Sequence, residues 1–330
     1  MDSFYDPIFA NYNLKIKDNY DLIFENTLTG NIDTDVEILN QSYNGKNILL
    51  MYDTNPVWWF EDYFARLAEQ VNYVYLASAN LANFWNQDPK IVYFPTFLLT
   101  QKNHDNHQSF EKSYRFSFLS NKPRLHRIYF YYVVRNYITD NDVFSVNNSA
   151  FNRDWWYQQF KSDMLTTIGD YYPEIEETLP FITDNAHKCN LQLNTLGDLI
   201  NDHSNKHIAY NAYFNVTGET DNTPGKIFVT EKTWKAVRSG TLPIFLDIDS
   251  FDYMAKLGFN FENEINIKKT YLDKVRHLKD CFKNISMLDA KDVYQRNLST
   301  VKENIKLYHS NHLLNKFIDQ IYAKLDLTIP

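Results

Sequence analysis

Residues 226–246 read KIFVTEKTWKAVRSGTLPIFL and predict a helix followed directly by a strand. Thr230 is a residue type favoured at helix N-caps, and Gly240 is the type that most often ends a helix. Together they predict a helix over 231–239. The apolar segment TLPIFL at 241–246 predicts the next strand. This alternation indicates an α/β domain.

Two segments upstream extend the alternation. Ala209–Asn215 (AYNAYFN) predicts a strand, and Val216–Lys226 predicts a loop rich in Gly, Asp, Asn and Pro. Tyr114–Leu119 predicts another strand, followed by a loop over Ser120–Arg124 and a largely apolar helix over Leu125–Tyr137. Junctions between strands and helices are where open α/β sheets bind ligands.

The N-terminal part of the chain shows a similar rhythm. Asn47–Tyr52 (NILLMY) is a short continuous apolar run, as expected of a strand buried on both faces. A helix is predicted over Trp58–Val71, and further strands over Tyr73–Ala77 and Ile91–Phe94. Modest connections between these strands predict a parallel sheet. The polar stretch Gln101–Lys112 is the candidate interdomain linker.

The predicted fold is therefore α/β, with two Rossmann-like domains that face a cleft. Residues 1–106 form the first domain and residues 107–330 the second. Apolar residues within Asp292–Leu325 lie near one stripe, which predicts C-terminal helices that pack across the domains. A coiled-coil dimer is the alternative for this segment, so both a monomer and a homodimer remain open.

The composition is that of a packed protein. Hydrophobic residues make up 44% of the 330 residues and charged residues 22%, which excludes a largely disordered chain. No apolar run approaches the roughly 20 residues that a membrane span needs. The N-terminus MDSFYDPIFA lacks the features of a secretory signal, so we expect a cytoplasmic protein. Cys189 and Cys281 are expected to be free thiols.

Two predicted junctions carry candidate anion-binding residues. At the second, Thr230 is the expected N-cap, Lys232 can neutralise a phosphate, and Glu231 can accept hydrogen bonds from sugar hydroxyls. At the first, Arg124 and Arg127 follow a buried strand and offer planar forks to a diphosphate. The alternative at both junctions is a solvated helix start with surface charges.

Taken together, the two junctions resemble the α-1,3-fucosyltransferase family. The resemblance lies in Ser120-Asn121 followed six residues later by Arg127, in Val229-Thr230-Glu231-Lys232, and in Thr241-Leu242-Pro243-Ile244. It implies a GT-B fold, a GDP-fucose-like donor and inversion at the anomeric carbon. It places a diphosphate-binding role on Arg127, a phosphate-binding role on Lys232 and a sugar-binding role on Glu231. The implied donor-binding residues are Asn121, Arg124, Arg127, Phe228, Thr230 and Lys232.

The match covers roughly residues 114–250 and departs from the family in two places. Phe214-Asn215-Val216-Thr217 lacks the Glu and Asn of the family's strand end. Asp247-Ile248-Asp249 stands where the family has a small turn. This DxD also looks like a metal motif of a different fold, but capping of a loop explains it better. We expect no metal, because Arg127 and Lys232 supply positive charge.

The N-terminal strand Asn47–Tyr52 ends before Asp53, which resembles the family's catalytic-base carboxylate. An inverting transfer needs one carboxylate to deprotonate the acceptor hydroxyl. The alternative is that Asp53 caps a turn before Pro56. Glu61 and Asp62 are the reserve candidates for the base.

The predicted function is an inverting glycosyltransferase that moves a sugar from a nucleotide diphosphate donor, with a GDP-sugar favoured, to a hydroxyl acceptor such as a glycan. Two alternatives remain open. His126-Arg127, the TEK tripeptide and Leu257-Gly258-Phe259 also resemble glycosyltransferase-like proteins of phages and marine bacteria, which allows modified DNA bases as acceptors. The net charge of −8 weighs against a nucleic-acid partner. The second alternative is a non-catalytic nucleotide- or glycan-binding module.

Overall fold

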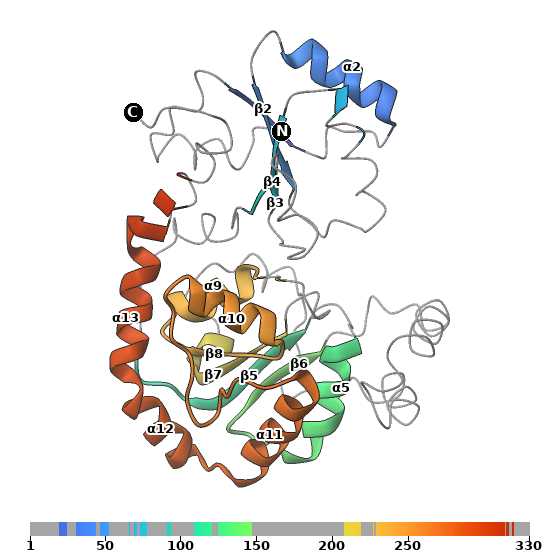
Figure 1. The fold of residues 1–330 in the computed structure, drawn as a ribbon. Helices are drawn as coiled ribbons and strands as arrows, with labels where there is room; N and C mark the ends of the chain where they lie inside the picture. Colours follow the sequence, from blue (N-terminus) through green and yellow to red (C-terminus); the bar gives the residue numbers. More distant parts are fainter. Residues whose placement is uncertain are drawn as a thin grey trace. The chain divides into compact units, whose positions relative to one another are not determined.

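The computed structural model shows two compact units, each built on a four-stranded parallel sheet (Figure 1). Unit 1 consists of Met1–Asn103, Gly225–Glu231 and Ser310–Pro330, and unit 2 of His104–Pro224 and Lys232–His309. The residues that the structure describes are 20–24, 31–43, 47–52, 66, 69–70, 73–77, 91–93, 109–120, 125–146, 208–218, 227, 229–313, 315–316 and 319.

Unit 1 places its described strands in chain order, β1-β2-β3-β4, and every neighbouring pair is parallel. The predicted strands at 47–52 and 73–77 are confirmed, and the one at 91–94 ends one residue earlier. Sequence patterns did not predict the first strand and the helix that follows it. The elements are β1 (Tyr20–Phe24), α2 (Ile32–Tyr43), β2 (Asn47–Tyr52), β3 (Tyr73–Ala77) and β4 (Ile91–Tyr93).

Unit 2 has the strand order β6-β5-β7-β8, again with all pairs parallel. Its elements are β5 (Tyr114–Ser120), α5 (Leu125–Val134), the 3-10 turn η4 (Arg135–Tyr137), β6 (Val143–Val146), the 3-10 turn η6 (Ile208–Asn211), β7 (Ala212–Thr217), α9 (Glu231–Arg238), β8 (Leu242–Phe245), α10 (Ile248–Lys256), α11 (Tyr271–Asn284), α12 (Met287–Arg296) and α13 (Leu298–His309).

This strand order reverses direction between β5 and β7. The chain moves from β5 to β6 on one side, then returns to pair β7 with the other side of β5 and continues to β8. Right-handed crossovers in opposite directions place α5 and α9 on opposite faces of the sheet. Such a reversal is the topological switch point at which doubly wound sheets bind ligands, beyond the carboxyl ends of the strands. In unit 1 the described strands show no reversal of this kind.

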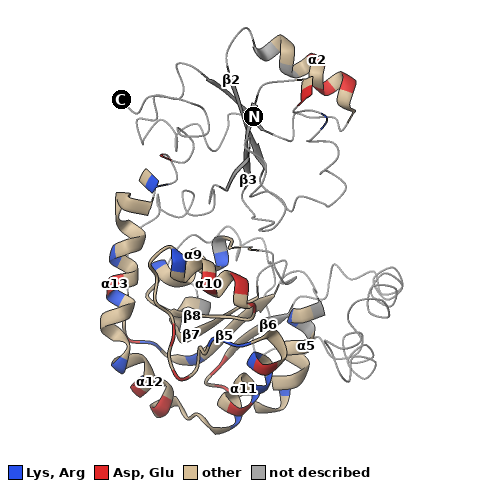
Figure 2. Ribbon diagram, viewed as in Figure 1, with Lys and Arg blue, Asp and Glu red and all other residues tan. Residues whose placement is uncertain are grey.

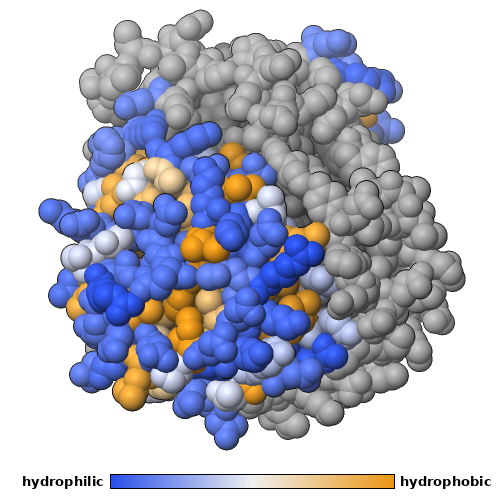
Figure 3. Space-filling model, turned by 60° about the horizontal axis from the view of Figure 1, so that its bottom comes forward, coloured by the Kyte–Doolittle hydropathy of each residue, from blue (hydrophilic) through white to orange (hydrophobic). Residues whose placement is uncertain are grey.

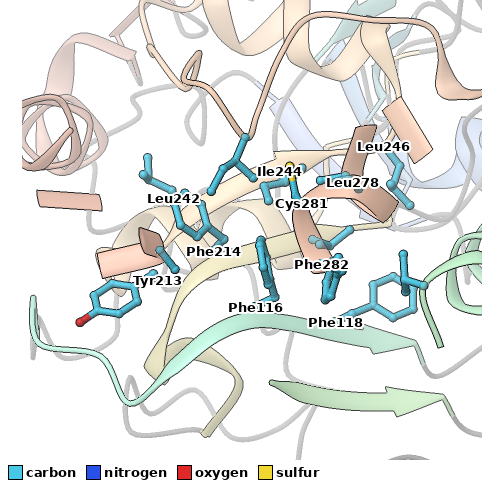
Figure 4. Packing of buried hydrophobic residues seen from close by; sticks show 14 of the residues in the cluster. Phe116, Phe118, Tyr213, Phe214, Leu242, Ile244, Leu246, Leu278, Cys281 and Phe282 are labelled. Atoms are coloured by element: carbon cyan, nitrogen blue, oxygen red, sulfur yellow. The ribbon is translucent and has the colours of Figure 1, made fainter. Parts of the chain in front are cut away.

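The core of unit 2 is rich in aromatic side chains on one face of the sheet. Phe116 and Phe118 alternate along β5, and Phe116 lies beside Phe214 of β7 in the strand register. Figure 4 shows Phe282 of α11 beside Phe116 and Phe118, and the ring centroids of Phe116 and Phe282 are 4.2 Å apart. Helices α5, α11 and α12 supply the other side of this core. These aromatic contacts form the core beneath one face of the sheet that carries the carboxyl edge.

Several predicted boundaries in unit 2 shift by a few residues. The strand predicted over 209–215 is β7 at 212–217, because 208–211 form a 3-10 turn and Val216 and Thr217 continue the ladder. The helix predicted over 125–137 ends at Val134 and tightens into η4. The C-terminal pattern is two helices, α12 and α13, separated at Asn297.

The structure corrects the end of the predicted interdomain linker. Lys112 is buried, and its Nζ donates hydrogen bonds to the carbonyl oxygens of Tyr210 at 3.0 Å and Ser239 at 2.9 Å. Tyr294 of α12 donates to the carbonyl oxygen of Gly240 at 2.5 Å. The bonds to Ser239 and Gly240 satisfy carbonyl groups directly after α9, and the bond to Tyr210 joins Lys112 to the turn η6. Polarity predicted an interdomain linker that extends to Lys112, but the buried Lys112 belongs to unit 2 and holds the end of α9.

A second buried lysine joins the loop after α10 to α11. Nζ of Lys274 donates to Oδ1 of Asn266 at 2.6 Å, and Nδ2 of Asn266 donates to the carbonyl oxygen of Pro243 at 3.0 Å. Burial lowers the pKa of both Lys112 and Lys274 from the ordinary 10.5 to about 7. Burial raises the pKa of the free thiol Cys281 to about 12.

These shifts predict that stability rises between pH 7 and pH 9. In that window both lysines stay protonated in the unfolded chain but lose their protons in the folded chain as the pH rises. The free energy of unfolding therefore increases with pH. Each lysine contributes at most about 1.4 kcal/mol per pH unit. Above pH 9, ionisation of Cys281 in the unfolded chain opposes the trend. Denaturant titrations at several pH values measure the slope.

Lys112→Met should reduce this slope, because one of the two titrating lysines is gone. The exposed Lys279 provides the control, and Lys279→Met should keep the slope of the unmodified protein. Only the slopes are compared, since Lys112→Met also removes two hydrogen bonds and lowers stability at every pH. Equal slopes in the unmodified protein and Lys112→Met would show that Lys112 stays protonated when folded.

The surface of unit 2 mixes polar and apolar side chains. In the view of Figure 3, hydrophilic residues separate the hydrophobic patches, as on the water-exposed surfaces of most folded domains. Leu288 at the start of α12 is a large hydrophobic residue with 73% of its surface exposed. None of the described helices is long and apolar enough to cross a membrane.

Candidate functional site

The candidate site lies at the carboxyl edge of the unit 2 sheet. β5 ends at Ser120, β7 at Thr217 and β8 at Phe245, and the parallel pairing brings these ends to one edge. Helices α5, α9 and α10 begin on the side of this edge, because they follow β5, β7 and β8 in the chain. Their N-terminal backbone N–H groups and helix dipoles favour anions.

Arg127 sits in the first turn of α5 and is only 2% exposed. Its side chain lies against Gly218, the residue directly after β7: a Cβ built on that glycine would be 3.1 Å from Cγ and 3.5 Å from Nε of Arg127. Arg127 therefore lies at the reversal between β5 and β7. The alternative that it is a solvated surface charge is wrong.

A hydrogen bond from α11 fixes the helix turn that carries Arg127. The hydroxyl of Tyr271, at the start of α11, donates a 2.6 Å hydrogen bond to the carbonyl oxygen of His126. His126 itself is buried. Contacts between α5 and α11 thus keep the first turn of α5 at the strand ends.

Helix α9 begins at Glu231 as predicted, with Thr230 in the N-cap position and buried. Lys232 is half-buried in the first turn. The rest of the helix is enclosed, and the ring of Trp234 packs edge-on against Phe259 at 5.7 Å between centroids. The helix ends at Arg238, and Gly240 follows two residues later with a φ of 71°, the left-handed conformation that glycine adopts without strain. As the crossover between β7 and β8, α9 directs its N-terminus to the carboxyl edge.

Asp247 follows β8 and is the N-cap of α10. Its Oδ1 accepts a 2.6 Å hydrogen bond from the backbone N–H of Ser250. This confirms that Asp247, the first aspartate of Asp247-Ile248-Asp249, has a capping role. Among the described residues no group of three or more His, Cys, Asp or Glu side chains could hold a metal ion.

A polar contact crosses the strands just below the site. Nδ2 of Asn215 in β7 donates to Oγ of Ser117 in β5 at 2.8 Å, and Oγ1 of Thr217 is 3.3 Å from Oδ1 of Asn215. Asn215 belongs to the strand end at which the chain departs from the fucosyltransferase pattern. Here it ties β5 to β7 at the switch point, on the face opposite to Phe116 and Phe118.

The structure places Arg127 at the end of β7, and it places Lys232 in the first turn of the helix that follows β7 in the chain. The predicted catalytic base Asp53 lies outside the described residues, as do Asn121, Arg124 and Phe228, and so does the side chain of Glu231. Sequence reasoning did not single out Gly218. A glycine directly after a strand at the carboxyl edge of the sheet is the signal that could have found it.

Charge on the described helices is mixed in sign. Lys and Arg residues alternate with Asp and Glu along α11 and α12 (Figure 2). A duplex-DNA binder usually carries a stripe of Lys and Arg on one face. Within the described residues these two helices do not provide such a stripe.

Searches against protein-family models, curated proteins and solved structures found no match.

Proposed function

We propose that this chain is an inverting glycosyltransferase of GT-B type that takes a nucleotide diphosphate sugar, with a GDP-sugar favoured, and transfers the sugar to a hydroxyl acceptor. The proposal combines the sequence resemblance to α-1,3-fucosyltransferases with the geometry of unit 2. Two α/β units support it, since a GT-B enzyme consists of two such domains.

One observation carries the proposal. The buried Arg127 lies at the end of β7, at the switch point where a doubly wound sheet binds its ligand. The resemblance gives this same residue the diphosphate. The buried guanidinium of Arg127 and Lys232 in the first turn of α9 supply positive charge in a chain of net charge −8, which supports an anionic ligand.

The chemistry follows from these charges. As the bond between the anomeric carbon and the diphosphate breaks, negative charge develops on the leaving phosphate. Arg127 and Lys232 stabilise that charge, so they act most strongly in the transition state. Glu231 binds the sugar hydroxyls, and Asp53 takes the proton of the attacking acceptor hydroxyl.

Thermal unfolding with a nucleotide panel tests the donor class. The panel contains GDP, GDP-sugars, UDP, UDP-sugars and the nucleosides, each with and without Mg²⁺. A ligand at about 100 times its Kd stabilises the protein by about 2.7 kcal/mol, which a melting curve detects. We expect a shift with GDP or a GDP-sugar that is lost in Lys232→Ala.

Each result has a distinct meaning. A shift with uridine nucleotides alone would support the same binding site but would show that the donor is a UDP-sugar and not a GDP-sugar. Binding without hydrolysis or transfer in the presence of glycan acceptors would favour the non-catalytic module. If no nucleotide shifts the melting temperature, the proposed function is wrong.

A further inference from the structure

We infer that Gly218 is a positioning residue for the diphosphate site: the absence of a side chain at this position lets Arg127 lie across the end of β7. The inference rests on the proposed function, because the diphosphate is the ligand that Arg127 would bind. It adds a residue that neither the motifs nor the resemblance includes.

The contact is tight on two sides. A Cβ on Gly218 would lie 3.1 Å from Cγ of Arg127 and 3.3 Å from Cε2 of Phe118. Both distances are shorter than ordinary van der Waals contact, so an added methyl group requires one neighbour to move. The space that other residues fill with a side chain is filled here by the arginine.

Phe118 is fixed by the core. Its ring packs against Phe130 at 5.0 Å and Phe144 at 5.6 Å between centroids, and its side chain is fully buried. Arg127 is also buried, but it reaches the strand ends on a long flexible chain. The arginine is therefore the group that an added methyl displaces, by a few tenths of an ångström or more.

Such a displacement matters because a guanidinium binds a diphosphate through a planar fork with strict geometry. Misplacement of a functional group by 1 Å can lower an enzyme's rate about 100-fold. The displacement expected here is smaller, so we expect Gly218→Ala to weaken diphosphate binding about 10-fold. The larger side chain in Gly218→Val should weaken it further. Gly218 lies directly after an extended strand, and the effect comes from the space it leaves for Arg127.

Calorimetric titrations of the full chain test the inference with GDP, or with UDP if the panel selects it, and with the matching nucleoside. Gly218→Ala should lose affinity for the diphosphate and keep its affinity for the nucleoside. In an Arg127→Ala background, Gly218→Ala should cause no further loss, because the group it displaces is absent. A purely structural role would lower both affinities and would persist in the double variant.

Phe118→Leu separates the two contacts. It removes the ring edge that the new methyl meets, but it leaves Arg127 in place. The loss caused by Gly218→Ala should therefore persist in Gly218→Ala/Phe118→Leu, whereas restored binding would place the effect in the core and overturn the inference.

The outcomes distinguish this inference from the proposed function. If Arg127→Ala weakens diphosphate binding but Gly218→Ala does not, or if the two losses add, Gly218 has no positioning role and the proposed function stands. If the unmodified protein binds none of the nucleotides, both fail. A crystal structure of Gly218→Ala should show the guanidinium moved and the Phe118 ring in place.

Discussion

Replacement of Asp142 by alanine should lower the free energy of unfolding by about 3–5 kcal/mol, the usual cost of leaving a buried charge without its partner. Arg115 and Asp142 form a two-pronged ion pair in unit 2, with Nε to Oδ1 at 2.9 Å and Nη2 to Oδ2 at 2.6 Å. Only 5% of the arginine side chain and none of the aspartate side chain is exposed.

The arginine is held by much more than this carboxylate. Its guanidinium also donates to the carbonyl oxygens of Tyr137, Phe282 and Ile285, and it lies over the ring of Phe282. It therefore joins β5 to the ends of η4 and α11. Asp142 in turn accepts a 2.9 Å hydrogen bond from the N–H of Thr139. Without Asp142, the positive charge of Arg115 would stay buried and would lose its carboxylate partner.

Chemical denaturation with two optical probes measures the effect. The control is Asp252→Ala, which breaks the pair between Lys268 and Asp252 at 2.6 Å, where both side chains are more than one third exposed. We expect that change to cost less than about 1 kcal/mol. Equal losses in the two variants would show that Asp142 contributes no more than a surface charge. Asp142→Asn should lose less than Asp142→Ala, because the amide oxygen still accepts hydrogen bonds.

Local signals in the sequence were sufficient for much of the fold. Thr230 predicted the start of α9, and Gly240 predicted its end to within one residue, because capping and left-handed termination are properties of single residues. β2, β3 and β5 follow from short apolar runs between polar stretches. A parallel sheet could be predicted from the spacing of those runs.

Features that depend on distant contacts could not be predicted in this way. Lys112 lies in a polar stretch, yet its partners Tyr210 and Ser239 follow far along the chain. For Arg127 the sequence left a diphosphate-binding role and a surface charge both open, and it did not indicate that Gly218 lies beside the side chain at the end of β7. Tertiary structure supplies hydrogen-bond partners for Lys112 and space for the side chain of Arg127, and no local pattern indicates either.

Arg127→Ala and Lys232→Ala should each lower turnover of the nucleotide sugar by about 100-fold or more, as loss of a group that stabilises transition-state charge does in other enzymes. Because the charge on the diphosphate grows as the sugar leaves, kcat should fall together with kcat/KM. Release of the nucleoside diphosphate, measured with the donor that shifts the melting temperature, provides the rate.

Matched controls separate the site from general surface charge. Lys256→Ala removes an exposed lysine at the C-terminal end of α10, away from the carboxyl edge of the sheet. Arg276→Ala removes an exposed arginine of α11. Both should turn over the donor at the unmodified rate. Because Arg127 is buried, its variant is compared at a temperature at which melting curves show it folded.

The two site variants differ in what their failure would mean. Lys232 is half-buried, so a normal rate in Lys232→Ala would remove the first turn of α9 from the phosphate site and leave the role of Arg127 open. A normal rate in a folded Arg127→Ala would be more damaging, since Arg127 is the residue that the switch point and the sequence resemblance both select. With that group dispensable, the buried arginine beside Gly218 would have only a structural role, and the glycosyltransferase assignment would lose the observation that carries it.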